Sequence, residues 1–383
     1  MSRVQCKGDS VHSEKGEYDR KRGWTSPLPL KVPVLLYMYE RLLDMNNLHN
    51  AFLECKKSVG WKSSVQNYEA NELFNLNQLR KRLAEHIYRQ KPFFEFDINE
   101  RGKVRHIKSL HISDRVLQRA LCDCILTPAI KPCLIYDNGA SVKGKGIEFS
   151  RRRLKAHLRK FYLRHGDNGY VLSIDFSKYF DNIRHDRLVE MLKKRIDDGE
   201  TMELVEYLIG TFGDSGKGVG IGSQISQIAG ILYPTEIDSY CKTVRRCRFY
   251  GRYMDDTYII DESKEFLKSV LCGIRGICTR LGIIINERKT QIKRLSDGFT
   301  FLKMRYLFSR TGKIVVIPCR KTITRERRKL KKLRARLVQG KITMAEICEQ
   351  YRSWRGNIKR FNAYKSVRSV DALYKSLFSE VTK

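Results

Sequence analysis

The segment Tyr170–Asp181 reads YVLSIDFSKYFD, and the segment Arg248–Ile260 reads RFYGRYMDDTYII. The first is an apolar run that leads to Asp175, which predicts a strand that presents this carboxylate at its end. In the second, β-rich residues stand on both sides of Asp255 and Asp256, which predicts a hairpin with the acidic pair in its turn. An aspartate at a strand end that faces the acidic pair of a hairpin would bring three carboxylates together.

Three carboxylates that face one another have a chemical use. Mg²⁺ takes oxygen ligands, and two such ions about 3.5–4 Å apart clamp the attacking and leaving oxygens of an in-line phosphoryl displacement. Each segment alone has an ordinary explanation, because acidic pairs are common in solvated loops and an aspartate often follows a strand as a turn residue. Both segments in this order, in a strongly basic chain, favour a two-metal site for phosphoryl transfer.

The composition indicates a globular protein that binds a polyanion. The chain has 383 residues, of which 42% are hydrophobic, so it can bury sizeable cores. Lys and Arg number 75 against 42 Asp and Glu, which gives a formal net charge of +33. Such a charge favours nucleic acid, since each neutralised phosphate releases counterions. Ribosomal and basic membrane-surface proteins share this balance, so charge alone does not identify the partner.

The sequence also bears on the compartment. Residues 1–24 are polar and charged, unlike a signal peptide, and the longest apolar stretches fall short of a membrane span. The 11 cysteines are scattered and form no paired CxxC zinc pattern, which predicts buried free thiols in a reducing environment. We therefore expect a cytoplasmic protein without a membrane partner.

The spacing of apolar and charged residues divides the chain into four zones. Residues 1–28 are polar and aperiodic, which predicts a loose N-terminal arm. Residues 29–167 are mainly helical, with the first helical spacing from Val34 and short strands with a turn at 103–112. Residues 168–308 alternate strands with helices. Residues 309–383 are helical and basic, so the whole is predicted to be an α+β fold. The strands expected in the third zone are 170–174, 249–253, 258–261, 283–285 and 299–306.

Several segments resemble reverse transcriptases, in the order in which that family carries them. YMDD at Tyr253–Asp256 resembles the C motif, and DFSKYFDNI at Asp175–Ile183 resembles the A motif. AFLECKKSVGWKSS (51–64) is similar to the N-terminal segment of group II intron-type enzymes, and YRSWRGNIKRFNAY (351–364) is similar to their thumb segments. The other matches are the fingers motif KVRHIKSLHISDRVLQ (103–118), the B motif IGSQISQ (221–227), the D motif LGIIINERKTQI (281–292) and the primer-grip hairpin FTFLKMRY (299–306).

The resemblance implies a right-hand polymerase that extends a primer on an RNA template. Residues 29–167 would form an N-terminal extension and fingers, residues 168–308 the palm with some interleaved fingers elements, and residues 309–383 a basic helical thumb. Template RNA, cDNA and dNTPs would be its partners. A DNA-templated polymerase or primase is an alternative, against which the similarities in the fingers and thumb argue.

The resemblance also implies roles for individual residues. Asp175, Asp255 and Asp256 would hold two Mg²⁺ ions, for which Mn²⁺ is an alternative, and the Phe176 carbonyl would be a further ligand. Lys289 would act on the leaving pyrophosphate as proton donor or charge partner, unless it is a solvated loop lysine. The substrate would be contacted by Arg105, Phe180, Ile221, Gly222, Gln227, Tyr253 and Met254, and the nucleic acid by Lys303, Arg327, Lys331 and Arg334.

Three of these residues carry a qualification. Phe180 stands five residues after Asp175, where an aromatic ring blocks a ribose 2′-hydroxyl, and its alternative is simple core packing. Lys303 stands where the family usually has a Gly. Arg327 and its neighbours lie on a helix that keeps Leu330, Leu333 and Leu337 for packing, and a merely solvated basic face is the alternative there.

The B motif bears on the branch of the family. Group II intron and retron enzymes usually carry a Gln before the B-motif Gly and a Pro at its end, whereas this chain has Ile221 and Gln227. That form resembles reverse transcriptases of diversity-generating retroelements, for which a small basic accessory protein is a candidate partner. There Ile221 and Gln227 would help to set how loosely templating adenines are copied. Anti-phage defence reverse transcriptases are the alternative, and an inactive RNA-binding homologue is a remote one, since all three metal carboxylates are present.

Overall fold

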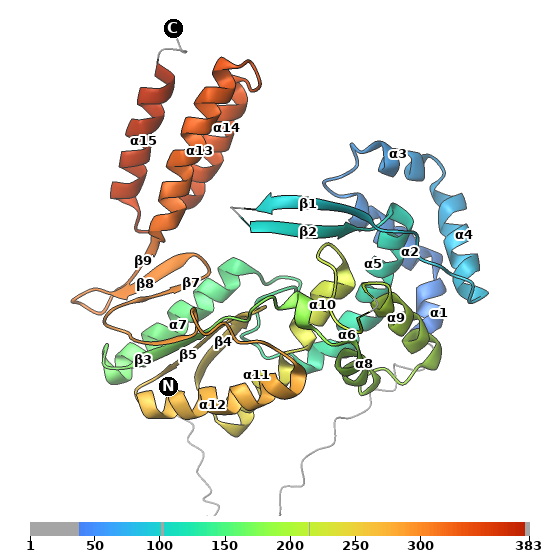
Figure 1. Ribbon diagram of the computed structural model, residues 1–383, viewed down its shortest axis with the longest axis horizontal. Helices are drawn as coiled ribbons and strands as arrows, with labels where there is room; N and C mark the ends of the chain where they lie inside the picture. Colours follow the sequence, from blue (N-terminus) through green and yellow to red (C-terminus); the bar gives the residue numbers. More distant parts are fainter. Residues whose placement is uncertain (1–37, 101–102, 214, 380–383) are drawn as a thin grey trace, which may run out of the picture. The chain divides into compact units, whose positions relative to one another are not determined.

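The computed structural model describes residues 38–100, 103–213 and 215–379 (Figure 1). The arm expected at residues 1–28 and the helical spacing expected from Val34 begin outside these residues. The helices are α1 (Met38–Leu43), α2 (Met45–Lys56), α3 (Ser63–Ala70), α4 (Glu72–Ala84), α5 (Ile112–Leu121), α6 (Thr127–Ile130), α7 (Ile147–His165), α8 (His185–Lys193), α9 (Gly199–Gly210), α10 (Gln224–Leu232), α11 (Thr235–Ser239), α12 (Lys264–Leu281), α13 (Arg320–Val338), α14 (Met344–Lys359) and α15 (Tyr364–Phe378). The strands are β1 (Phe94–Glu100), β2 (Lys103–Ser109), β3 (Tyr170–Ile174), β4 (Phe249–Tyr253), β5 (Asp256–Asp261), β6 (Gln291–Arg294), β7 (Phe299–Phe301), β8 (Met304–Phe308) and β9 (Ile314–Pro318).

The described strands form a hairpin and two sheets. β1 pairs with β2, the central sheet has the order β4–β5–β3–β6, and the third group has the order β7–β8–β9. All these pairings are antiparallel. Because β3 lies between β5 and β6, its end is flanked by the β4–β5 turn on one side and by the chain that enters β6 on the other.

Helices cover both faces of the central sheet. Leu154, Leu158 and Phe161 of α7 share one buried core with Val171 of β3 and Ile260 of β5. Side chains along a strand alternate between the two faces, so the residues next to these point to the opposite face. There α12 packs against β3 and β5, and Figure 1 shows α7 and α12 on opposite sides of these strands. The mixed helix and sheet fold expected from the sequence is confirmed.

The strands around the acidic residues agree with the sequence. The strands expected at 170–174 and 249–253 have those bounds in β3 and β4. The strand expected at 258–261 begins earlier, at Asp256, because Tyr253 pairs directly with Asp256 across a tight turn. Their dense β-branched and aromatic residues suit a buried sheet, which is why the pattern predicted them well.

The strand expected at 283–285 is wrong. Gly282 ends α12 in the left-handed conformation, with a φ of +72°, and Ile285 then forms an isolated bridge with Phe176. The chain becomes a strand later, as β6, whose exposed and mostly polar residues carry no strand pattern. β9 was likewise not expected, since it lies in the zone predicted to be helical.

The last three helices form a bundle with its own core. Leu330 and Leu333 of α13 are buried in this core and Leu337 packs partly against it, which confirms the apolar face expected for this helix. α14 begins with a capping box, in which the Thr343 and Glu346 side chains bond to each other's backbone N–H groups. The basic side chains of α13 therefore lie on its other faces.

One junction joins the bundle to the rest of the described chain. Val316 N–H in β9 donates to Asn362 Oδ1 at 3.1 Å, and Asn362 N–H donates to the Val316 carbonyl at 2.9 Å. Arg151 of α7 lies over the Phe361 ring at 5.2 Å and donates to the Leu302 carbonyl at 2.9 Å. The α14–α15 link, the third sheet and α7 therefore meet at this junction.

The structure also bears on the expectations about membrane-spanning segments and about the cysteines. None of the described helices is long and apolar enough to cross a membrane. The cysteines within the described ranges are free thiols, but the expected burial holds only in part, since Cys122 and Cys278 are buried whereas Cys272 is exposed. Burial raises the pKa of Cys122. Such a thiol is poorly ionised and therefore unreactive, as expected for a packing residue.

Candidate active site

The turn between β4 and β5 holds the acidic pair. The register pairs Tyr253 with Asp256, so Met254 and Asp255 are the two turn residues. Met254 has a φ of +54°, in the left-handed region that L side chains rarely adopt. Two-residue hairpin turns require such a φ at one or both central positions, usually on Gly, Asn or Asp. The turn therefore keeps Met254 strained while it presents Asp255 and Asp256 at the crest of the hairpin.

Asp175 follows β3 and lies beside this turn. β3 pairs with β5 in a register that brings Asp175 next to Asp256. Lys289 Nζ donates to both carboxylate oxygens of Asp175, at 2.8 and 2.7 Å. Asn286 donates from Nδ2 to the same carboxylate at 3.0 Å and from its N–H to the Asp175 carbonyl at 2.8 Å. The segment between α12 and β6 thus fixes Asp175 through its backbone and its side chain.

Burial and mutual repulsion act on the acidic pair. Burial raises the pKa of Asp255, and the Asp175 carboxylate adds to the rise, while the charges of Lys289 and Arg105 oppose it. Burial, then repulsion from Asp255 and Asp175, raises the pKa of Asp256 to about 7. Carboxylates in this situation favour a bound cation, since added positive charge relieves both the repulsion and the cost of burial.

The donor set is chemically suited to a hard divalent metal. Carboxylate oxygens are the ligands that Mg²⁺ and Mn²⁺ prefer. Among the described residues, no three His, Cys, Asp or Glu side chains are grouped as a ready metal site. Both carboxylate oxygens of Asp175 instead contact the Lys289 ammonium, which supplies the local positive charge. The residues fit the metal in chemistry and in charge, and their ligation of it stays a prediction.

Phe180 lies between the chain after β3 and helix α10. Its half-buried ring packs edge-on against Tyr179, with ring centroids 5.4 Å apart, and Phe176 is buried against the same tyrosine. A Cβ added at Gly230 would lie 3.0 Å from the Phe180 ring and 3.3 Å from the Met254 sulfur. The expected gate residue and the turn residue therefore meet at Gly230, where the lack of a side chain leaves room for both.

The B-motif residues lie against the β1–β2 hairpin. Lys108 N–H of β2 donates to the Ile221 carbonyl at 3.3 Å. Gly222 has a φ of +120°, and a Cβ there would lie 3.1 Å from the Lys108 carbonyl, so this close approach requires glycine. Ser141 Oγ donates to Gln227 Oε1 at 3.2 Å. Gly222 and Gln227 also line a cavity of about 250 Å³. The structure thus brings the three residues to one region between α5 and α10.

The positive charges of Arg105 and Lys303 act on the pKa values of the acidic pair. Arg105, on β2, favours the ionised form of Asp255, and Lys303 favours that of Asp256, since each holds the respective pKa down. Lys303 and Leu302 form the two-residue turn between β7 and β8, with φ values of +65° and +47°. Both central residues are left-handed, as a type I′ turn requires, which is the physical reason why a Gly is usual at Lys303.

The other expected contact residues have varied surroundings. Tyr253 is half-buried against the core between α7 and the central sheet, and burial raises its pKa. On α13, Lys331 is exposed and Arg334 is half-buried. Arg327 is exposed, and its Nη2 donates to Ser369 Oγ of α15 at 2.5 Å. The three basic residues therefore lie on the bundle, separate from the carboxylates.

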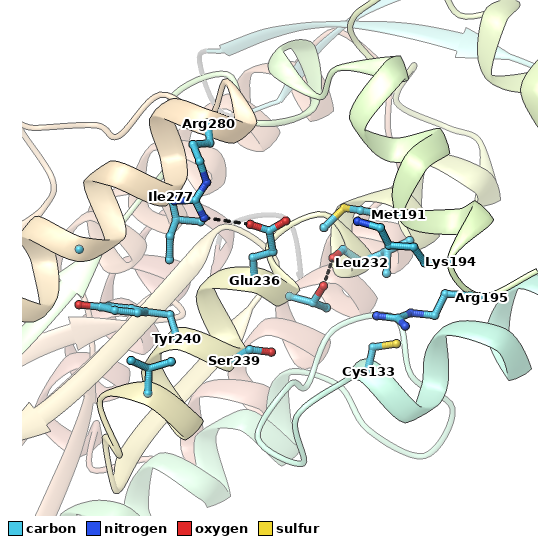
Figure 2. A pocket seen from close by; sticks show the side chains of 13 residues that line it. Cys133, Met191, Lys194, Arg195, Leu232, Glu236, Ser239, Tyr240, Ile277 and Arg280 are labelled. Atoms are coloured by element: carbon cyan, nitrogen blue, oxygen red, sulfur yellow. Dashed lines mark hydrogen bonds and ion pairs between the residues drawn. The ribbon is translucent and has the colours of Figure 1, made fainter. Parts of the chain in front are cut away.

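A cavity of about 590 Å³ lies away from the acidic site (Figure 2). It is formed by residues of α8, α11 and α12 and the chain next to them, and Figure 2 shows Glu236 paired with Arg280 at its wall. No residue predicted to bind substrate, metal or nucleic acid lines this cavity. The geometry of the carboxylates, rather than cavity size, identifies the candidate active site.

Two residues near the acidic site, Asn286 and Arg252, were not predicted from the sequence. Asn286 holds Asp175 from three positions before Lys289, where a polar residue in a turn is unremarkable in a sequence. Arg252 is fully buried in β4 and is paired with Asp238. An arginine at an inner position of the apolar run RFYGRY is the one signal for it, because a charge at such a position needs a buried partner.

Comparisons with known proteins agree with this geometry. The family model described as reverse transcriptase (RNA-dependent DNA polymerase) matches residues 90–306. Protein YkfC of Escherichia coli (strain K12) is 25% identical over 255 residues, which cover 55% of this chain and 65% of that protein. The putative COX1/OXI3 intron 1 protein of Saccharomyces cerevisiae (strain ATCC 204508 / S288c) is 23% identical over 189 residues, which cover 46% of this chain and 22% of that protein. The chain thus spans less than two thirds of the length of either relative.

The fold has a counterpart among solved structures. Telomerase from Candida albicans, solved in complex with a TWJ fragment of telomeric RNA, matches with a TM-score of 0.50 at 12% identity. The match covers 77% of this chain and 55% of that one, and at this identity it concerns the fold, which is that of a right-hand polymerase. The family model spans more than half of the 383 residues and includes β3 and the β4–β5 turn, so the chain belongs to the reverse transcriptase (RNA-dependent DNA polymerase) family.

Proposed function

We propose that this protein is an RNA-directed DNA polymerase that extends a primer on an RNA template with dNTPs. The observation that carries the proposal is the strand register that places Asp175 beside Asp256 and the β4–β5 turn, where burial and repulsion raise the pKa of Asp255 and Asp256. Lys289 and Arg105 add positive charge beside them. A polymerase needs this combination, because its substrate brings phosphates and its reaction needs divalent cations.

The regions of the polymerase follow from this proposal. Residues 29–167 would be the N-terminal extension and fingers, residues 168–308 the palm with interleaved fingers elements, and residues 309–383 the thumb. The central sheet with its acidic turn belongs to the proposed palm, and the β1–β2 hairpin with Arg105 belongs to the proposed fingers. The basic bundle α13–α15 would bind the template RNA and the cDNA through their phosphates.

Each site residue has a proposed task. Asp175, Asp255 and Asp256 would hold two Mg²⁺ ions, or Mn²⁺ in their place, together with the Phe176 carbonyl. When bound, such ions activate the primer 3′-hydroxyl and neutralise charge on the phosphates. Lys289 would stabilise or protonate the leaving pyrophosphate. These residues would therefore act as one unit, in which the loss of a single carboxylate removes most of the activity.

Residues around the incoming nucleotide would select and orient it. Arg105 would bind the triphosphate, since a guanidinium offers several donors to phosphate oxygens. The Phe180 ring, held against Tyr179 and Gly230, would fill the space that a ribose 2′-hydroxyl needs. Ile221, Gly222, Gln227, Tyr253 and Met254 would contact the base pair or the primer end, and Lys303 would contact the primer strand.

The experiment that tests the activity compares single carboxylate variants. Asp255→Asn and Asp175→Ala should abolish primer extension on an RNA template, while RNA binding stays nearly unchanged because carboxylates do not attract phosphate. Asp186→Asn is a matched control, since Asp186 is an exposed aspartate of the same region, paired with Arg184. Primer extension by purified Asp255→Asn at a rate near that of the native protein would contradict the proposal.

We also propose that the polymerase serves a diversity-generating retroelement. The B motif supports this role, because Ile221 offers only apolar contact where most relatives have a Gln that can hydrogen-bond. A small basic accessory protein would be a partner. The alternative is a defence enzyme against phage, and the remote one is an inactive RNA-binding homologue.

Sequencing of the cDNA made by the purified enzyme, with any accessory protein from its operon, separates these roles. Frequent misincorporation opposite template adenines is expected for diversification. Uniformly low error at adenines would favour a defence enzyme, and the absence of cDNA together with intact RNA binding would favour the inactive homologue. A template repeat and a variable repeat in the neighbouring DNA would be an independent sign of diversification.

A further inference from the structure

A fully buried ion pair lies behind the acidic turn. Arg252 of β4 and Asp238 of α11 both have side chains with 0% exposure. Arg252 Nε donates to the two carboxylate oxygens at 2.9 and 3.1 Å, and Nη2 donates to Oδ2 at 2.6 Å. Tyr250 Oη donates to Oδ1 of the same carboxylate at 2.5 Å. A buried charge pair is tolerated when its groups are hydrogen-bonded in this way, although an apolar pair of similar volume often stabilises a protein equally well.

The guanidinium has further bonds beyond this pair. Arg252 Nη1 donates to the carbonyl of Met254 at 3.3 Å, and Nη2 donates to the carbonyl of Ile231 in α10 at 2.9 Å. Met254 is the left-handed residue of the β4–β5 turn, directly before Asp255. One side chain therefore joins α11, α10 and the turn that presents the acidic pair.

The backbone of Arg252 is held as firmly as its side chain. Its N–H donates to the Asp137 carbonyl at 3.3 Å, and its carbonyl accepts from the Gly139 N–H at 3.2 Å. The Asp137 carboxylate in turn accepts from Arg153 Nε of α7 at 2.6 Å. The guanidinium thus projects from a fixed point, which makes its hydrogen bond to the Met254 carbonyl a directional restraint on the turn.

The restraint acts where the backbone is strained. A non-glycine residue with a positive φ persists when its surroundings over-determine that conformation. The bond from Arg252 to the Met254 carbonyl supplies such a determinant, because rotation of the Met254–Asp255 peptide would break it. The bond to Ile231 acts next to Gly230, where the Phe180 ring and the Met254 sulfur meet.

We propose that Arg252, anchored by Asp238, is a positioning residue of the polymerase. It fixes the Met254–Asp255 peptide and so the direction in which Asp255 and Asp256 present their carboxylates. It also sets the distance between the turn and α10. The inference rests on the proposed polymerase activity, and it assigns to the buried pair a task that an apolar pair cannot perform, namely donation to the turn carbonyl.

The test replaces the pair by apolar residues of similar size. The double variant Arg252→Met with Asp238→Leu removes both charges together, so that no buried charge is left without a partner. We expect thermal unfolding and template–primer binding near those of the native protein, and kcat for primer extension about a hundredfold lower, the scale of a misplaced site residue. The Mg²⁺ concentration for half-maximal rate should rise, and KM for dNTP should change little.

A second readout follows the metal without turnover. Mn²⁺ binding, measured by electron paramagnetic resonance of the free ion, should weaken at least several-fold in the double variant. The matched control is Arg184→Gln with Asp186→Asn, which removes a bidentate Arg–Asp pair of the same region that is solvent-exposed. This control should keep the native kcat, Mg²⁺ dependence and Mn²⁺ binding.

Arg252→Lys decides the question if the double variant does not fold. It keeps a positive charge beside Asp238, but one ammonium on a flexible stem does not replace the planar fork that reaches the carboxylate and two carbonyls. A folded Arg252→Lys protein, or a folded double variant, with native kcat and native Mn²⁺ binding would overturn the inference. A native protein that extends no primer would overturn the proposed function instead, and Mn²⁺ binding would still report on the positioning of the turn.

Discussion

The central sheet and helix α13 use charge in opposite ways. In the sheet, Arg252 is fully buried and bonded to a carboxylate and two carbonyls. On α13, Lys331 is exposed, and the helix carries most of its basic residues on solvent-facing surfaces. Chemistry at a fixed point needs a charge with one geometry, whereas attraction to a phosphate backbone needs many charges and tolerates loose placement. Basic side chains would thus meet two different demands in one chain, with α13 in its proposed role on nucleic acid.

The largest expected effect of this difference is on the free energy of unfolding. Arg252→Ala should destabilise the fold by about 3–5 kcal/mol, because it leaves the buried Asp238 carboxylate without its partner. Lys331→Ala on α13 should change the free energy of unfolding by no more than about 0.5 kcal/mol, since its side chain is exposed. Urea unfolding of both variants measures the difference. If the two substitutions lowered the free energy of unfolding equally, the two charged side chains would be held alike and the difference between the sheet and α13 would be wrong.

The next effect concerns selection of the sugar. Phe180→Ala should lower the preference for dNTP over rNTP by about tenfold or more, since the space that excludes a 2′-hydroxyl is opened. The ratio of kcat/KM values on a defined RNA template measures this preference. Phe180→Tyr is the matched control, because it keeps the ring against Tyr179 and Gly230. An unchanged ratio in the alanine variant would mean that Phe180 is a packing residue.

A smaller effect is expected from α13. Replacement of Arg327, Lys331 and Arg334 by Gln should reduce the slope of log K against log[salt] for a template–primer duplex by about two to three units, near 0.7–0.9 for each lost contact. Ser369→Ala sharpens the test, since it releases Arg327 from its hydrogen bond to Ser369 and should leave the slope the same or steeper. An unchanged slope in the triple variant would place these residues on a face that meets solvent or a protein.

The smallest effect concerns fidelity. Ile221→Gln should lower misincorporation opposite template adenine by about tenfold, the factor that corresponds to one added polar contact of about 1.4 kcal/mol. The backbone of Ile221 is already fixed by Lys108, so the substitution changes the side chain at a constant position. Sequencing of cDNA from both proteins measures the error rate. No change at adenines would remove Ile221 from the proposed diversification.

The sequence predicts strands β3 and β4 of the central sheet better than it predicts the strands and loops that flank them. β3 and β4 were predicted to the residue because β3 is an apolar run that leads directly to Asp175, and β4 is rich in aromatic residues and leads into the turn with the acidic pair. The strand expected at 283–285 is wrong because the chain, after Gly282 ends α12 in the left-handed conformation, makes only an isolated bridge, between Ile285 and Phe176. β6 escaped prediction because its exposed, mostly polar residues carry no strand pattern and its pairing with β3 makes it a strand. β9 does carry a β-branched run, IVVI, but it lies at the start of the zone that was predicted to be helical.

The same distinction applies to the candidate site. Asp175, Asp255 and Asp256 could be identified from the sequence, because each lies within a short motif whose residues are contiguous in the chain. The pairing of Arg252 with Asp238 depends on how α11 packs against β4, and nothing in either segment states that contact. The hydrogen bond from Asn286 to Asp175 likewise depends on how the loop before β6 folds back to β3. Such partners become visible when the tertiary structure is known.

The junction at Asn362 has a mechanical consequence. Two hydrogen bonds between Val316 and Asn362 tie the α14–α15 link to β9, and Arg151 joins the same place to the carbonyl of Leu302 in the β7–β8 turn. A displacement of the α14–α15 link would therefore strain the hydrogen bonds to β9 and, through Arg151, the contact at the turn that carries Lys303. The α14–α15 link, the third sheet and α7 are thus held together at one point, so that movement of the proposed thumb would be coupled to the position of this turn.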